Sequence, residues 1–432
     1  MTINEAGLLC KLFRNNQELL WRFLIISYLC NHTPSAMMKR IVTGAVVLLL
    51  LLLWSADVSA QQYHYKLNFS LSVEDFADTI SISVDQGRVY VPVSIGGHTY
   101  RFLLDTGAGM GGIYSDTRID GAKSVGHITS HDANGRSHTT PVMSLPPMQL
   151  GKLTVTDYRV NVVNRPPGVK NADGIVGFDI FNKGLLGKID VRQKRLILTD
   201  RKTLFRDEPG YEARYRLNFH VPQVTVSPFK GFKEAVRFDT GDRSLYTISR
   251  ETLEQAAMEV DQHLIDSQTE GRTVGSLRMS HYGTETTDEV TALCLWQLRW
   301  GDYSFYNVRT LTAQGRATIG AALLNYGTVI INPHKRRLIF QPYDGGEGTM
   351  VDNRLPDIYY VPLHGMASVG LVWEDSEPYR QGFRQGDIIL QINDTPIRSF
   401  RQFTAFPFIK GMTYTMTLRD KEGRDKQVRL TR

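Results

Sequence analysis

Two copies of Asp-Thr-Gly carry the clearest chemistry in this sequence, at residues 105–107 and 239–241. Each copy follows an apolar stretch that is typical of a buried β-strand. A carboxylate on a tight turn at the end of such a strand is exposed in a cleft while its neighbours are buried. Two carboxyl groups that approach to about 3 Å cannot both ionise easily, so they share a proton. One could then deprotonate a water molecule that attacks a carbonyl carbon, while the other donates to the developing oxyanion.

A duplication of the chain would bring these two aspartates together. Three features recur in the same order in the two halves of the chain. The Asp-Thr-Gly copies are 134 residues apart, and the apolar segments around Gly151 and Gly301 are 150 residues apart. The longer segments that begin at Gly177 and Gly320 are 142–143 residues apart. Three features at nearly constant offset predict an internal repeat of mostly β structure. If the two lobes pack about a pseudo-twofold axis, Asp105 and Asp239 face each other across it. Gly107 and Gly241 are expected to let the backbone turn sharply beneath each carboxylate.

The sequence around both turns resembles the aspartic protease superfamily, in a bilobed arrangement with short, retropepsin-like β-barrel lobes at residues 85–205 and 211–345. The resemblance is carried by Phe102 to Gly109, Asp173 to Gly177 and Val236 to Gly241. It implies that Asp105 and Asp239 are the catalytic dyad and that Thr106 and Thr240 brace the two loops through hydrogen bonds between the lobes. It also implies that the strands ending at Ile175-Val176-Gly177 and Thr318-Ile319-Gly320 cross beneath the loops.

The family closes a β-hairpin flap over its substrate. In the first lobe this resemblance places the flap at Ile128 to Thr140, turning at Asn134-Gly135, and in the second lobe at Leu277 to Thr287. One position departs from the family: Asp242 stands where Ser, Thr or Ala is usual, and Arg243 follows it. The extra carboxylate would raise the pKa of Asp239 unless Arg243 neutralises it. The sequence therefore predicts an aspartic-type endopeptidase, with a non-catalytic peptide-binding protein on a protease fold as the alternative.

The last residues, 357–432, are similar to a PDZ domain, a small β/α fold. Gly386-Asp387-Ile388-Ile389 and the following Ile392-Asn393 carry this resemblance. It implies recruitment of polypeptides, because PDZ domains bind an extended peptide as an added strand. The alternative is a packing or assembly module without an open groove.

The amino-terminal end predicts export. Met37-Met38-Lys39-Arg40, an apolar run and small residues before Ala60 are typical of a signal peptide at 37–60. We expect a periplasmic or extracellular protein, membrane-anchored only if this segment is uncleaved, and we interpret residues 1–36 as an over-extended start. Residues 61–84 are either a pro-segment or a β-rich lead-in.

Composition limits the partners and cofactors. A formal net charge of +6 over 432 residues is too small to predict a nucleic-acid partner. The three cysteines form no metal-binding spacing, and His127 and His131 have no third ligand at a fixed spacing. Since the dyad chemistry needs no metal, we expect neither a metal nor a cofactor, and polypeptides as substrates.

Overall fold

The computed structural model describes residues 64–72, 74–131, 137–166, 169–277, 279–280, 283–284 and 286–432. Residues 62–432 form one compact unit. The predicted start at 1–36 and signal peptide at 37–60 lie outside the described residues. Among the residues that are described, no helix combines the length and apolar character needed to cross a membrane.

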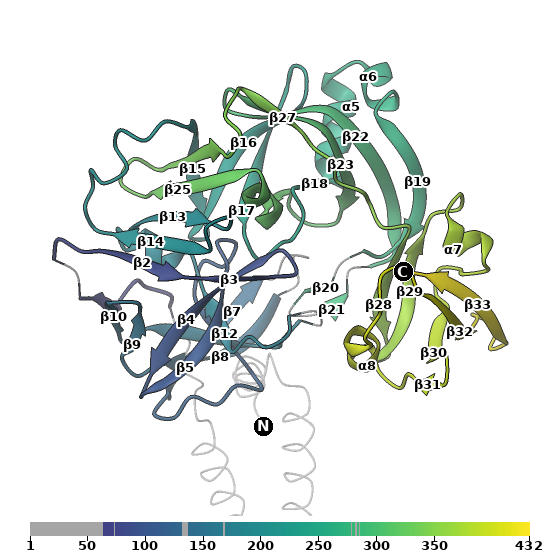
Figure 1. Ribbon diagram of the computed structural model, residues 1–432, viewed down its shortest axis with the longest axis horizontal. Helices are drawn as coiled ribbons and strands as arrows, with labels where there is room; N and C mark the ends of the chain where they lie inside the picture. The colour runs from purple at the N-terminus through teal and green to yellow at the C-terminus, as the bar shows by residue number, and fades with distance from the viewer. Residues whose placement is uncertain are drawn as a thin grey trace, which may run out of the picture. The chain divides into compact units, whose positions relative to one another are not determined.

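The first lobe is built almost entirely of strands (Figure 1). Its elements are β1 (Ser70–Leu71), β2 (Ala77–Ser81), β3 (Ser83–Asp85), β4 (Arg88–Ile95), β5 (His98–Leu104), β6 (Gly112–Tyr114), β7 (Lys123–His131), β8 (Ser137–Ser144), β9 (Met148–Leu150), β10 (Leu153–Thr156), β11 (Arg159–Val163), β12 (Gly174–Val176), α4 (Asp179–Asn182), β13 (Leu186–Asp190) and β14 (Arg195–Thr199).

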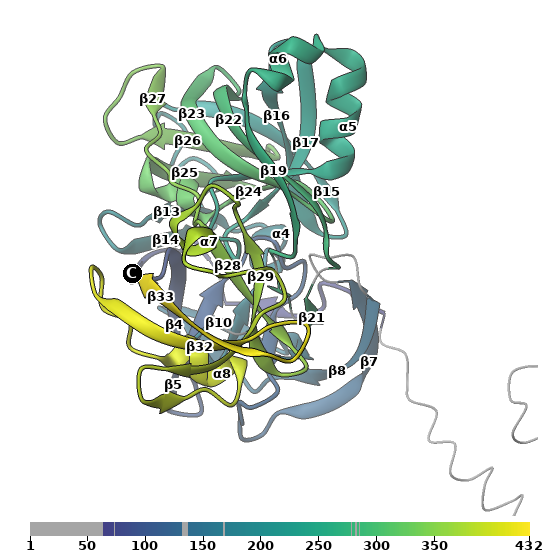
Figure 2. The same ribbon diagram turned by 90° about the vertical axis from the view of Figure 1, so that its right-hand side faces the viewer.

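The second lobe repeats this plan and adds two helices, which pack over its strands (Figure 2). Its elements are β15 (Tyr211–Asn218), β16 (Val221–Phe229), β17 (Phe232–Asp239), β18 (Tyr246–Ser249), α5 (Arg250–Glu259), α6 (Gln262–Asp266), β19 (Thr269–Gly275), β20 (Met279–Ser280), β21 (Gly283–Thr284), β22 (Asp288–Trp300), β23 (Tyr303–Ala313), β24 (Thr318–Gly320), the 3₁₀ helix η1 (Ala321–Asn325), β25 (Gly327–Asn332), β26 (Arg337–Pro342) and β27 (Gly348–Met350).

The repeat is visible in strand pairing as well as in sequence. The hairpin β4–β5 leads into Asp105, and the hairpin β16–β17 ends at Asp239. Strand β12 lies parallel to β5, as β24 lies parallel to β17. Gly151 and Gly301 both adopt left-handed backbone conformations, with φ of 61° and 56°, in equivalent hairpin turns. The prediction of a mostly β chain with two duplicated lobes is confirmed.

The lobes share one sheet, in which strands follow the order β15-β26-β25-β13-β14-β2. At its centre β13 and β25 pair antiparallel, with Lys188 opposite Ile330. These two residues are also repeat equivalents, because 188 plus the offset of 142 is 330. A pair of antiparallel strands that meets at equivalent residues is what a twofold axis through the sheet requires.

Strand β2 closes one edge of that sheet, with Ile80 opposite Leu196. It comes from the segment 61–84, which the sequence left open between a pro-segment and a β-rich lead-in. Its pairing with β14 makes this strand an integral part of the first lobe. Residues 343–356, which precede the C-terminal sheet, also contain a strand, since β27 pairs with β23.

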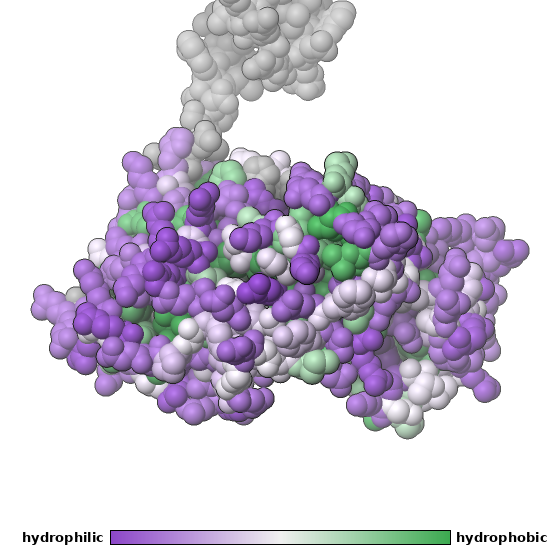
Figure 3. Space-filling model, turned by 90° about the horizontal axis from the view of Figure 1, so that it is seen from above, coloured by the Kyte–Doolittle hydropathy of each residue, from purple (hydrophilic) through white to green (hydrophobic). Residues whose placement is uncertain are grey.

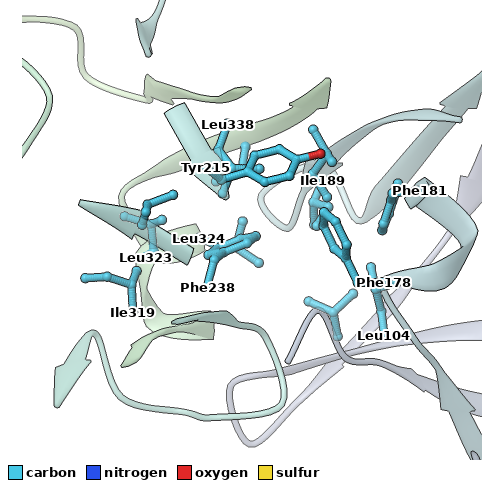
Figure 4. Packing of buried hydrophobic residues seen from close by; sticks show 14 of the residues in the cluster. Leu104, Phe178, Phe181, Ile189, Tyr215, Phe238, Ile319, Leu323, Leu324 and Leu338 are labelled. Carbon is cyan, nitrogen blue, oxygen red and sulfur yellow. The ribbon is translucent and has the colours of Figure 1, made fainter. Parts of the chain in front are cut away.

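A continuous hydrophobic core joins the lobes (Figure 4). Leu104 and Phe178 of the first lobe and Tyr215 and Phe238 of the second belong to the same buried cluster. Burial of each such side chain stabilises the fold by about 2 kcal/mol. Hydrophilic residues cover most of the face seen in Figure 3, and hydrophobic residues appear there only in separate small areas.

The C-terminal residues form a separate sheet with its own core. The elements are β28 (Ile358–Leu363), β29 (Met366–Val372), α7 (Glu377–Arg380), β30 (Ile388–Ile392), β31 (Thr395–Pro396), α8 (Phe400–Ala405), β32 (Thr413–Arg419) and β33 (Asp425–Thr431), with the sheet order β28-β29-β30-β32-β33. The sheet meets the second lobe where the Ser276 N–H donates to the Gly370 carbonyl at 2.9 Å. Leu371 is buried in one cluster with Val290 and Leu311 of that lobe.

Candidate active site

The two Asp-Thr-Gly loops meet between the lobes and are joined through their threonines. The Thr106 N–H donates to the Thr240 hydroxyl at 3.0 Å, and the Thr240 N–H donates to the Thr106 hydroxyl at 3.0 Å. Each hydroxyl in turn donates across to a carbonyl, that of Phe238 at 2.9 Å and that of Leu104 at 2.6 Å. Both threonines are fully buried, so this exchange of four hydrogen bonds fixes the loops against each other. The structure thus has the contacts that the resemblance implied for Thr106 and Thr240.

The carboxyl groups of Asp105 and Asp239 are hydrogen-bonded to each other. Each also accepts an N–H from its own loop, Asp105 from Gly107 at 2.8 Å and Asp239 from Gly241 at 3.0 Å. Asp239 is buried, whereas Asp105 is half-buried. The structure therefore brings together the two carboxyl groups that the sequence singled out.

The glycines of the two loops leave room for the opposite carboxylate. A Cβ atom on Gly107 would lie 2.2 Å from the Asp239 Cγ, and one on Gly241 would lie 2.6 Å from the Asp105 Oδ2. Neither glycine has the positive φ that favours glycine in a sharp turn. The expectation that glycine is needed here for backbone freedom is therefore wrong: it is needed for space.

Burial and mutual repulsion keep a proton on the pair. Burial raises the pKa of Asp105 and, together with the negative charge of Asp105, raises the pKa of Asp239 to about 7. The hydrogen bond between them raises the pKa of Asp239 and lowers that of Asp105. The two carboxyl groups therefore share one proton and do not both ionise easily.

A buried aspartate that the sequence analysis missed supports the loop of the first lobe. Asp179 accepts hydrogen bonds from the Tyr158 hydroxyl at 2.8 Å and from the Gly111 N–H at 3.1 Å. The adjacent Phe178 N–H donates to the Ala108 carbonyl at 2.7 Å. Burial raises the pKa of Asp179 to about 7. Asp179 lies within the repeated segment from Gly177, but its role depends on Tyr158, which no local pattern links to it.

In the second lobe Asp242 performs a similar task from within the loop. Its carboxylate accepts from the Ser244 N–H at 2.9 Å, the Ser244 hydroxyl at 2.8 Å and the Thr318 hydroxyl at 3.0 Å. Its negative charge also raises the pKa of Asp239, but burial and the charge of Asp105 raise that pKa more. The unusual aspartate thus anchors its own loop and contributes less to the pKa of Asp239 than the first-lobe carboxylate does.

Arg237 is a second residue that the sequence analysis did not single out. It precedes Asp239 by two positions on β17, and its Nη1 lies 3.8 Å from the Asp239 Oδ2. Its side chain is only 15% exposed. The guanidinium charge lowers the pKa of both dyad carboxyl groups and so opposes the effect of burial. Residues two positions apart on a strand point to the same side, a signal that was present in the sequence.

The expected flap regions differ between the lobes. Strands β7 and β8 form an antiparallel hairpin with Ile128 opposite Thr140. Its predicted turn at Asn134-Gly135 lies outside the described residues. In the second lobe β20 and β21 pair over two residues each, and the Thr284 hydroxyl donates to the Pro362 carbonyl of the C-terminal sheet at 3.5 Å.

Within the described residues, no cluster of three or more His, Cys, Asp or Glu side chains has the proximity that a metal ion requires. His127 lies on β7, and the side chain of His131 is outside the described residues.

Comparison with known proteins points to the same class of site. Residues 91–180, which span β4 to α4 and include Asp105, match the aspartyl protease family. A crystal structure of the aspartic proteinase from Irpex lacteus is similar to this chain, with 13% sequence identity, a TM-score of 0.39, and coverage of 62% of this chain and 97% of that one. A search of curated proteins gives no match. The family match supports peptidase chemistry in the first lobe, and Asp239 of the second lobe joins that site through its hydrogen bond to Asp105.

Proposed function

We propose that this protein is an exported aspartic endopeptidase, which hydrolyses peptide bonds with a water molecule activated between Asp105 and Asp239. The observation that carries the proposal is the hydrogen-bonded pair of carboxyl groups, one from each Asp-Thr-Gly loop. The aspartyl protease match of residues 91–180 supports it.

The reaction uses the one proton that the pair shares. Asp105 takes a proton from water as its oxygen attacks the peptide carbonyl carbon, and Asp239 gives its proton to the carbonyl oxygen. As the C–N bond breaks, Asp105 donates its new proton to the leaving nitrogen, and Asp239 recovers a proton from a hydroxyl of the intermediate. Both carboxyl groups end in their starting states.

Hydrolysis of an unfolded protein substrate between about pH 3 and about pH 8 tests this mechanism. The full chain is compared with Asp105→Asn and Asp239→Asn, and Asp242→Asn serves as the matched control. We expect either dyad substitution to abolish cleavage and the Asp242 variant to retain it. A folded but inactive wild-type protein would instead support the peptide-binding alternative.

Export and recruitment are separate parts of the proposal. Mass spectrometry of the mature amino terminus tests cleavage after Ala60. A peptide from residues 1–36 in the mature chain would contradict this cleavage. For the C-terminal sheet we propose PDZ-like recruitment of polypeptides, supported by β28, which ends this sheet and in it pairs with β29 alone among the described strands. Binding of matched peptides with a free or an amidated carboxyl end tests this role, and equal affinity would favour an assembly module.

A further inference from the structure

One face of the second lobe carries an unusual concentration of positive charge. A cavity of about 970 Å³ opens on this face, and no acidic side chain lines it. Its lining residues are Arg214, Tyr215, Arg216, Gln223, Thr225, Ala235, Lys335, Arg336 and Arg337. Five of these nine residues are Lys or Arg. Glu212 pairs with Arg337. Among the described residues, the side chains of the other four cations form no ion pair.

Strand pairing connects this cavity to the dyad. Arg216 of β15 lies opposite Gln223 of β16, which lies opposite Arg237 of β17. Residues directly opposite each other in antiparallel strands point to the same side of the sheet. Ala235, the last cavity residue on β17, precedes Arg237 by two positions, and Asp239 follows Arg237 by two. The cavity, Arg237 and the dyad therefore lie along one face of the sheet.

The hairpin turn between β15 and β16 lies at the end of this sheet face, against the catalytic loop of the first lobe. A Cβ atom on Gly109 would be 2.4 Å from the Phe219 carbonyl oxygen. Phe219 is 78% exposed, and the Arg316 guanidinium lies 5.8 Å from the centre of its ring. The Arg237 N–H donates to the carbonyl of Ala317 at 3.0 Å, one residue after Arg316. Arg237 thus stands beside the reacting carboxyl groups, and Arg316 lies near Arg237 and Phe219.

We propose that the cleft selects acidic polypeptide segments: Arg237 receives an Asp or Glu side chain next to the scissile bond, and Arg316, Arg214 and Arg216 receive carboxylates further along the same segment. The inference rests on the proposed function, because it names the class of substrate that the same cleft takes. Guanidinium groups bind carboxylates through charge-assisted, often bidentate hydrogen bonds. An acidic peptide is favoured over a nucleic acid because the positive face leads directly to the dyad.

Two peptides that differ only by Glu or Gln beside the cleavage site test the proposal. We expect the wild-type protein to cleave the Glu peptide with a kcat/KM about tenfold higher, in low salt, and to lose much of this preference in high salt. Arg237→Leu places in the second lobe the residue that the first lobe has at the equivalent position, Leu103. This variant is expected to lose the preference for the Glu peptide. A change in the charge of the dyad alone would instead alter kcat/KM for both peptides equally.

A longer acidic substrate tests the cavity. The double variant Arg214→Gln and Arg216→Gln is expected to slow cleavage of the long acidic substrate several-fold more than cleavage of the short peptides. Lys230→Gln, which removes one positive charge at the exposed β16–β17 turn, is the control for each single replacement. Unchanged cleavage of the long substrate by the double variant would remove the cavity from the proposal.

Measurements of peptide binding to an inactive variant distinguish this inference from the proposed cleavage reaction. Anisotropy of the labelled acidic peptide and its Gln counterpart is measured on Asp105→Asn. Preferential binding without cleavage by the wild type would uphold the inference and overturn the endopeptidase. Equal binding and equal cleavage of the two peptides would overturn the inference and leave the endopeptidase standing. Tighter binding of a duplex DNA oligonucleotide than of the acidic peptide would also overturn it.

Discussion

The two catalytic loops have the same backbone contacts but different supports. In the first lobe Asp179, from α4 beneath the loop, holds Gly111 and Tyr158. In the second lobe Asp242, within the loop, holds Ser244 and Thr318. At the repeat equivalents of these aspartates, each lobe has an alanine: Ala108 matches Asp242, and Ala322 matches Asp179.

The comparison teaches that a loop of this kind needs one anchoring carboxylate, which can come from either position. The hydrogen-bond donors around each position determine which of the two positions carries the aspartate. Ser244 and Thr318 are replaced in the first lobe by Met110 and Ile175, which offer no side-chain donor to a carboxylate at position 108. The supports therefore cannot be exchanged by moving the aspartate alone.

The largest expected effect comes from filling the space between the loops. Gly107→Ala and Gly241→Ala each place a Cβ atom against the opposite carboxylate, so we expect loss of at least about 100-fold in kcat/KM. Gly107→Ala is expected to be the more severe, because its Cβ would lie closer. Cleavage assays on folded variants measure this, with Gly271→Ala as a control, since Gly271 has no positive φ and a Cβ there would meet Trp373 at an ordinary 3.7 Å.

Removal of the two supports comes next. Asp179→Ala leaves the buried Tyr158 hydroxyl and the Gly111 N–H without their partner, and we expect a loss of about 3 kcal/mol in the free energy of unfolding. Asp242→Ala, in a half-buried loop, is expected to cost about 1 kcal/mol. Denaturant titration measures both. Equal losses would show that the two supports are interchangeable after all.

Each lobe also buries a carboxyl group that makes stability depend on pH. Burial raises the pKa of Asp179 in the first lobe and of Glu234 in the second to about 7. Glu234 accepts a hydrogen bond from Tyr246. Ordinary values in an unfolded chain are near 4, so between about pH 4 and about pH 7 the folded protein binds more protons. The free energy of unfolding should therefore fall as pH rises through this window.

Thermal unfolding across this pH range checks the expectation. We expect Tm to fall by several degrees, and Asp179→Asn or Glu234→Gln to make the fall smaller. The same slope in both variants and in the wild type would assign the effect to other groups. A reduction in only one variant would show that one lobe limits stability.

The smallest effect concerns the equivalent glycines of the repeated hairpin turn. Both have positive φ, so alanine is strained at either position by about 1 kcal/mol. In Gly151→Ala the new Cβ meets the side chain of Asp78, which can move, whereas in Gly301→Ala it meets the Glu212 carbonyl oxygen. We expect Gly301→Ala to be the more destabilising in denaturant titrations.

The parts of the site that lie next to each other in sequence could be predicted. The repeated Asp-Thr-Gly and the apolar strands before each copy led to the dyad and to the mostly β, two-lobed fold. The supports could not be predicted, because Asp179 depends on Tyr158. Strand β2 was missed as part of the first lobe for a similar reason: its pairing with β14 joins residues more than 100 positions apart. Such contacts are formed by tertiary packing and produce no local pattern in the sequence from which they could be predicted.

The pairing of Lys188 with Ile330 at the centre of the shared sheet has a consequence for how the chain is held together. The two lobes meet as two subunits of a symmetric dimer would, with three strands of the shared sheet from each. Residues 200–210 then act as a tether that raises the effective concentration of one half around the other. A cut within this tether would convert folding into an association, and the protein would assemble its cleft in a concentration-dependent way.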